Sequence, residues 1–181
     1  CFCLVDLSDG TAVVFNDGRA GRRLPPQSTF KVVNALFALE TGAAQDENSL
    51  RRWDGTDRGM EVWNRDHTLR SAIRYSVVWY FKEVAREVGP ERMSGYLRRI
   101  GYGNQDISGG IDSFWLQSSL RISAWEQVAF VAKLYRGQLP FASRTQHIVR
   151  KMLVLQRGPG FTFSGKTGSS ADGTLGWFVG S

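Results

Sequence analysis

A serine and a lysine three residues apart stand at the start of a long apolar segment. Ser28 and Lys31 follow two consecutive prolines, and the segment that they open continues to Gly42 with few polar residues. Prolines before a segment and a glycine after it are typical of a helix. Apolar residues on nearly every side predict that this helix is buried, and residues three apart lie on the same helical face.

This placement could activate a nucleophile. A helix N-terminus stabilises developing negative charge, and burial lowers the pKa of a lysine because it disfavours the charged form. A serine beside such an amine is suited to nucleophilic catalysis. The same four residues, Ser28 to Lys31, also fit an N-cap serine followed by a lysine whose charged end reaches solvent.

Other segments carry polar groups or aromatic residues that could complete a site. Each of them also has an ordinary structural explanation. They are Ser76-Val77-Val78, which fits a helix cap, Tyr102-Gly103-Asn104, which fits a turn, Trp115-Leu116, which fits a pair of core residues, and Lys166-Thr167-Gly168, which fits a strand end with a bulge.

Taken together and in this order, these segments resemble the class D β-lactamases, or oxacillinases, which belong to the serine enzymes that recognise penicillins. The resemblance extends over nearly the whole chain, including the segments 59–64 and 176–180. A class A enzyme would have asparagine at position 78 and a separate glutamate base, and neither pattern is evident here.

The resemblance implies a serine hydrolase that forms an acyl-enzyme. Ser28 would attack the lactam carbonyl, and Lys31 would react with CO2 to become N6-carboxylysine, the general base. The indole of Trp115 would donate to that carbamate, Ser76 would pass a proton to the leaving nitrogen, and Lys166 would hold the substrate carboxylate. The implied catalytic residues are Ser28, Lys31, Ser76, Trp115 and Lys166.

The resemblance also implies a substrate-binding set. Its members would keep the site apolar, bind the substrate carboxylate and, through backbone N–H groups at Ser28 and Ser169, form an oxyanion hole. The set comprises Met60, Trp63, Val78, Leu116, Thr167, Gly168 and Ser169. We expect no metal, and no cofactor apart from CO2 or bicarbonate, and we expect His67 and His147 to be structural or exposed.

Two alternatives remain open. A sensor domain of β-lactam receptors resembles these enzymes and is acylated without turnover, but that family has asparagine at position 78, where this chain has Val78. A peptidoglycan transpeptidase is disfavoured by the segments from Tyr102 to Leu116.

Composition limits the partners. The 181 residues fit one domain, and 23 basic against 17 acidic residues give a net charge of +6 without a basic stripe interleaved with aromatic residues, which argues against nucleic-acid binding. No membrane segment or signal peptide is evident.

The resemblance implies an exported protein, periplasmic or extracellular, and a homodimer is possible. Cys1 and Cys3 are expected to be small core residues.

The predicted fold class is α+β, an α/β/α sandwich in a single domain, 1–181. A hairpin over 2–7 and 11–15 and a late strand pair over 161–167 and 175–179 are expected to share one antiparallel sheet covered by helices. The sheet region would comprise 1–27 and 159–181, with a helical region over about 28–158 inserted between. The resemblance further implies a chain shortened at both ends.

Overall fold

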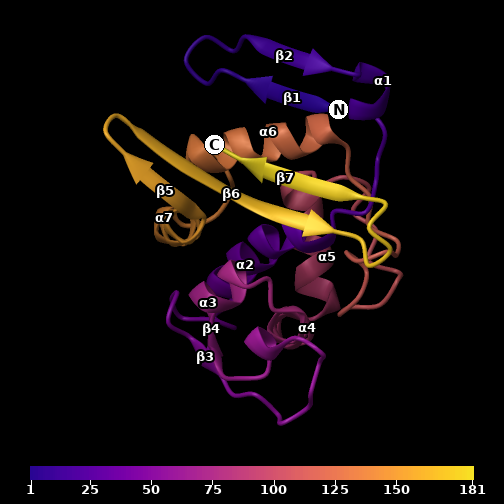
Figure 1. Cartoon of the computed structure of the whole chain (residues 1–181), viewed down its shortest axis with the longest axis vertical. Helices are drawn as coiled ribbons and strands as arrows, with labels where there is room; N and C mark the ends of the chain where they lie inside the picture. The colour runs from indigo at the N-terminus through magenta and orange to yellow at the C-terminus, as the bar shows by residue number, and fades with distance from the viewer.

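Helix α2 (Phe30–Thr41) runs through the centre of the computed structural model, which describes all 181 residues (Figure 1). Every residue from Phe30 to Leu39 is buried, as the apolar pattern predicts. Gly42 ends the helix in the left-handed region, with a φ of 81°, a conformation that glycine adopts without strain.

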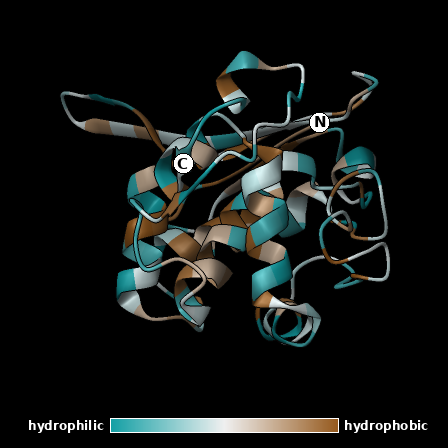
Figure 2. Ribbon diagram, turned by 90° about the horizontal axis from the view of Figure 1, so that it is seen from below, coloured by the Kyte–Doolittle hydropathy of each residue, from teal (hydrophilic) through white to brown (hydrophobic).

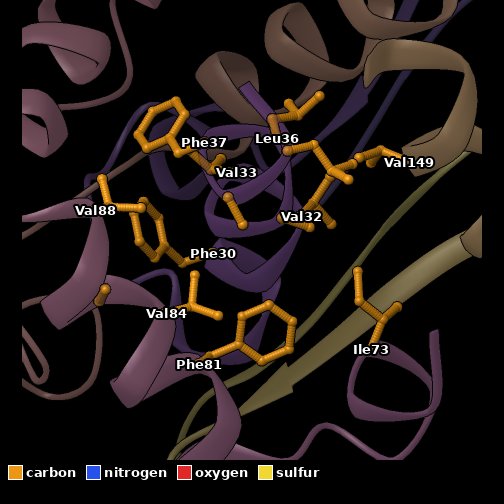
Figure 3. Packing of buried hydrophobic residues seen from close by; sticks show 14 of the residues in the cluster. Phe30, Val32, Val33, Leu36, Phe37, Ile73, Phe81, Val84, Val88 and Val149 are labelled. Carbon is orange, nitrogen blue, oxygen red and sulfur yellow. The ribbon is translucent and has the colours of Figure 1, made fainter. Parts of the chain in front are cut away.

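Three helices surround α2, and Figure 3 shows their side chains packed around it. They are α3 (Leu69–Arg74), α4 (Val78–Val88) and α7 (Ser143–Met152). The Asn34 side chain fixes α2 to α4, because its Nδ2 donates to the backbone oxygen of Phe81 at 3.1 Å. This bond satisfies a buried amide inside an otherwise apolar interface.

The remaining elements lie around this centre, and in Figure 2 the hydrophobic segments concentrate in the interior of the molecule. Helix α6 begins with the predicted capping box between Ser123 and Glu126. None of the helices is long and apolar enough to span a membrane. The other bounds are α1 (Asp17–Ala20), η1 (Gln27–Thr29), β3 (Leu50–Arg51), η2 (Glu61–Trp63), β4 (His67–Thr68), α5 (Pro90–Ile100) and α6 (Ala124–Tyr135).

The strands form separate antiparallel sheets in an α+β fold, so the expectation of one shared sheet is wrong. The hairpin pairs β1 (Phe2–Val5) with β2 (Ala12–Phe15). The late strands β5 (Val154–Gly158), β6 (Phe161–Ser169) and β7 (Gly176–Gly180) form a three-stranded sheet, and β3 pairs with β4 in a third, short sheet. Strands β1 and β7 both pack on α6 without pairing with each other (Figure 1). A largely apolar groove of about 830 Å³ lies between them.

Local details differ from the sequence-based predictions in three places. Val154–Gly158 is a strand rather than the end of the helical region, because it pairs with β6. Helix α4 begins at Val78 with Val77 as its N-cap, so Ser76 does not cap it. Cys1 is exposed and Cys3 only partly buried, so neither is a core residue.

Candidate active site

Ser28 and Lys31 face each other where η1 continues into α2. The Nζ of Lys31 lies 2.6 Å from the Oγ of Ser28. Ser28 is half-buried, whereas Lys31 has no exposed surface. Lys31 is therefore not the solvent-reaching lysine of the structural alternative, and Ser28 makes no N-cap hydrogen bond.

The environment of Lys31 disfavours its charged form. Burial, and then the nearby positive charge of Lys166, hold the pKa of Lys31 well below its ordinary value. The Lys31 Nζ also lies 5.9 Å from the centre of the Phe81 ring. A neutral amine has a lone pair, so it can accept a proton from the adjacent hydroxyl or react as a nucleophile itself.

The turn that carries Ser28 is held by residues that the sequence-based prediction missed. Gln27 adopts a φ of 53°, unusual for a residue with a side chain, and its N–H donates to the Trp115 backbone oxygen at 2.9 Å. The Thr29 hydroxyl donates to Pro26 O at 2.6 Å and accepts from Gln127 Nε2 at 2.9 Å. These bonds orient Ser28 from both sides, and no local sequence signal marks Gln27 for this conformation.

Trp115 lies directly against the start of α2. Its ring stacks on Phe30 with centroids 5.5 Å apart, and the edge of Phe114 packs against it at 5.1 Å. Trp115 is fully buried, yet its indole N–H has no hydrogen-bond partner. Buried donors are rarely left unpaired, so this N–H fits a site that accepts an additional hydrogen-bond acceptor. The neighbouring Leu116 is half-buried.

Strand β6 brings Lys166 and Gly168 against η1. Lys166 is buried, its Nζ donates to Thr167 O at 2.9 Å, and burial lowers its pKa to about 8. A Cβ at Gly168 would lie 3.0 to 3.1 Å from backbone atoms of Pro26, Ser28 and Thr29. Glycine at this position therefore allows the strand to approach the serine turn closely.

The register of β6 directs one backbone donor away from its partner strand. Ser164 and Ser181 exchange both backbone hydrogen bonds, and Ser170 N donates to Leu175 O at 2.9 Å. Because hydrogen-bonded and non-hydrogen-bonded pairs alternate, the Ser169–Gly176 pair is non-hydrogen-bonded. The N–H of Ser169 therefore points to the β6 edge opposite β7.

Ser76 lies in the turn between α3 and α4, and α4 packs on α2. Its φ is 57°, and its side chain is half-buried. Val78 is the half-buried first residue of α4. On the preceding loop, Met60 is 45% exposed and Trp63 is half-buried, with its indole N–H donating to Tyr75 O at 2.9 Å.

Comparison with known proteins decides the family. The model for the penicillin binding protein transpeptidase domain matches residues 7–181. The probable beta-lactamase YbxI of Bacillus subtilis is 52% identical over 99% of this chain and 67% of its own length. The beta-lactamase OXA-48 of Klebsiella pneumoniae is 41% identical over 96% of this chain and 70% of its own.

Solved structures agree with this assignment. The class D beta-lactamase BAT-2 superposes with a TM-score of 0.97 at 50% identity, covering 98% of this chain and 76% of that one. A class D beta-lactamase from Bacillus subtilis gives 0.97 at 51% identity with the same coverage. The chain belongs to the class D β-lactamases.

Within this class D β-lactamase, Ser28 contacts Lys31 directly, and the Gly168 backbone of β6 lies against the serine turn. Trp115 contacts Gln27 and Phe30, which flank that turn. The positive charge of Lys166 contributes to the lowered pKa of Lys31. Val78 begins α4, which packs on α2, and Ser76 lies in the turn before it, whereas Met60 lies on an exposed loop. His67 is buried and hydrogen-bonded, while His147 is exposed, as expected for structural and surface residues.

Proposed function

We propose that the chain hydrolyses β-lactam antibiotics through an acyl-enzyme on Ser28. The observation that carries the proposal is the distance of 2.6 Å between Lys31 Nζ and Ser28 Oγ, with Lys31 fully buried and its pKa lowered. Such a pair is suited to removing the serine proton as the hydroxyl attacks. The relatives of this chain are named as β-lactamases.

The reaction has two halves. Ser28 Oγ would bond to the lactam carbonyl carbon while its proton passes to the Lys31 side chain. As the carbon–nitrogen bond breaks, Ser76 would relay this proton from the Lys31 side chain to the leaving nitrogen, which frees the base again. The backbone N–H groups of Ser28 and Ser169 would stabilise the oxyanion. A water molecule, deprotonated by the same Lys31 side chain, would then attack the ester carbon. As the bond to Ser28 Oγ breaks, the proton would return from the Lys31 side chain to Oγ and restore the hydroxyl.

We propose that Lys31 works as a carbamate, N6-carboxylysine, formed with CO2. Only a neutral amine forms a carbamate, and burial beside Lys166 favours the neutral form. The unpaired indole N–H of Trp115 supports the proposal, because indole only donates and a carbamate oxygen accepts. When formed, the carbamate would supply the general base for both halves of the reaction.

Substrate binding would use the groups around this centre. Lys166 and Thr167 would hold the substrate carboxylate, and Val78 and Leu116 would limit the access of water. Met60, Trp63 and Gly168 would contact the bound β-lactam. We further propose that the protein acts outside the cytoplasm, in the periplasm or extracellular space.

The alternative is a sensor that is acylated and not turned over. Val78 favours hydrolysis over this alternative, because an apolar residue at the start of α4 keeps the surroundings of Lys31 apolar and the carbamate stable. Incubation with benzylpenicillin, with product release and intact mass followed together, tests both. Hydrolysis with a transient adduct supports the enzyme, and a lasting adduct supports the sensor. Neither product nor adduct would contradict both, and Ser28→Ala is the control for the attachment site.

A further inference from the structure

The Ser76 turn is held by backbone hydrogen bonds to α3, and one indole N–H adds a bond to the peptide between Tyr75 and Ser76. Ser76 has a φ of 57°, in the left-handed region that residues with a Cβ seldom adopt. Such a conformation persists when surrounding contacts fix it. The Nε1 of Trp63 donates to the Tyr75 carbonyl oxygen at 2.9 Å, and this carbonyl belongs to the peptide whose plane sets the φ of Ser76.

The donor is itself fixed on its other side. The Nε1 of Trp79 in α4 donates to the Trp63 carbonyl oxygen at 2.8 Å. Trp63, on the loop before β4, thus donates through its indole to the Ser76 turn and accepts through its backbone from α4. The loop and the Ser76 turn are therefore joined at two points.

His67 supports the same loop from the interior. It is 1% exposed, with its Nε2 2.9 Å from Val62 O and its Nδ1 2.9 Å from Ser71 Oγ. A carbonyl oxygen only accepts, so Nε2 carries a proton and donates to Val62 O. Burial lowers the pKa of His67, which favours the neutral ring with Nδ1 as an acceptor beside the Ser71 hydroxyl. The imidazole ring lies between the loop and α3, with Trp79 at 5.9 Å and Tyr75 at 6.2 Å between ring centroids.

We propose that Trp63 is a positioning residue that places the Ser76 hydroxyl through the Tyr75 carbonyl, a role of its indole N–H distinct from any contact of its ring with substrate. This inference rests on the proposed function of Ser76 in proton transfer. Phenylalanine at position 63 would keep an aromatic ring and remove only the N–H. The released peptide could then rotate, and Ser76 would leave its left-handed conformation.

A mutant cycle with benzylpenicillin tests the proposal. Trp63→Phe should lower kcat about fivefold, the factor expected for one net hydrogen bond, and leave KM nearly unchanged. In a Ser76→Ala background, Trp63→Phe should change kcat by no more than about twofold, because a residue that acts through the hydroxyl has nothing left to position. An equal loss of kcat in both backgrounds, or an effect on KM alone, would overturn the proposal.

Trp53→Phe is the matched control, because Trp53 Nε1 makes an equivalent bond to Thr56 O at 2.8 Å in an adjacent loop. It should leave kcat unchanged. Amide hydrogen exchange supplies a readout independent of catalysis: Trp63→Phe, and not Trp53→Phe, should accelerate exchange of the Ser76 and Val77 amides, which bond to Ile73 O and Ala72 O. Unchanged exchange would refute the positioning role even if the wild-type chain had no β-lactamase activity.

Discussion

Lys31 and Lys166 are two buried amines of one site, and the positive charge of Lys166 adds to burial in lowering the pKa of Lys31. The pKa of Lys31 is held well below its ordinary value by burial and by the charge of Lys166, whereas burial lowers that of Lys166 only to about 8. Lys166 therefore remains mostly positive at pH 7, which suits an anionic group of a ligand. The lowered pKa of Lys31 favours its neutral form, which suits proton transfer.

The first prediction concerns the role of Lys31 in both halves of the reaction. Lys31→Ala should reduce benzylpenicillin turnover by roughly 100-fold or more, the usual contribution of a general base, and any acyl-enzyme that forms should persist. Intact-mass measurement over time follows the adduct. Lys133→Ala, on the exposed side of α6, should behave as wild type. Rapid loss of the adduct from the Lys31 variant would refute the assignment.

The second prediction concerns CO2. Turnover should rise with added bicarbonate and fall at low pH, because protonation of the amine and of the carbamate both favour loss of CO2. Trp115→Phe should raise the bicarbonate concentration for half-maximal activity about tenfold, since it removes a hydrogen bond to a charged acceptor. Trp125→Phe, which loses only an indole bond to Asp17, is the control. Turnover insensitive to bicarbonate would exclude the carbamate.

The third prediction concerns the approach of β6 to the serine turn. In Gly168→Ala the new Cβ would meet three backbone atoms at 3.0 to 3.1 Å, so strand and turn must separate. We expect kcat to fall about 100-fold, as when one oxyanion donor is lost, with the far-ultraviolet circular dichroism unchanged. Gly176→Ala on β7 meets nothing within 4 Å and should retain activity. Full activity of Gly168→Ala would show that the spacing is not critical.

The fourth prediction concerns stability and pH. The pKa of Lys166 is about 8 in the folded protein against an ordinary value of 10.5, so the unfolded chain binds more protons between these values. The free energy of unfolding should therefore rise with pH across this window, by about 3 kcal/mol from this residue. Lys166→Met should flatten the rise in chemical denaturation measured in CO2-free buffer, and Lys133→Met should not. An identical pH profile in Lys166→Met would contradict the lowered pKa.

The parts of the fold that sequence predicts are those set by local patterns. The burial of α2, its end at Gly42 and the Ser123 capping box follow from residues within a few positions of one another. Strand β5 was not predicted, because Val154–Gly158 becomes a strand only through pairing with β6. The separation of the hairpin from β7 likewise depends on how both strands pack on α6.

In the candidate site, too, contacts between residues close in sequence are predictable, and features that depend on distant residues are not. Ser28 and Lys31 are neighbours because of helical spacing alone, so their contact is predictable. The left-handed conformations of Gln27 and Ser76 are not, because glutamine and serine rarely adopt them and distant residues stabilise them here. The unpaired indole of Trp115 also depends on contacts that the sequence does not specify locally.

The separate β1–β2 hairpin has a consequence for how the molecule fluctuates. A ribbon of two strands is barely stable by itself, every residue of β2 is exposed, and one link to α6 is the Arg136 guanidinium donating to Leu7 O at 3.0 Å. The hairpin can therefore open locally while the core around α2 stays folded. Opening of this hairpin would leave the Ser28–Lys31 contact in place. Loss of activity on heating therefore need not coincide with the melting of the hairpin.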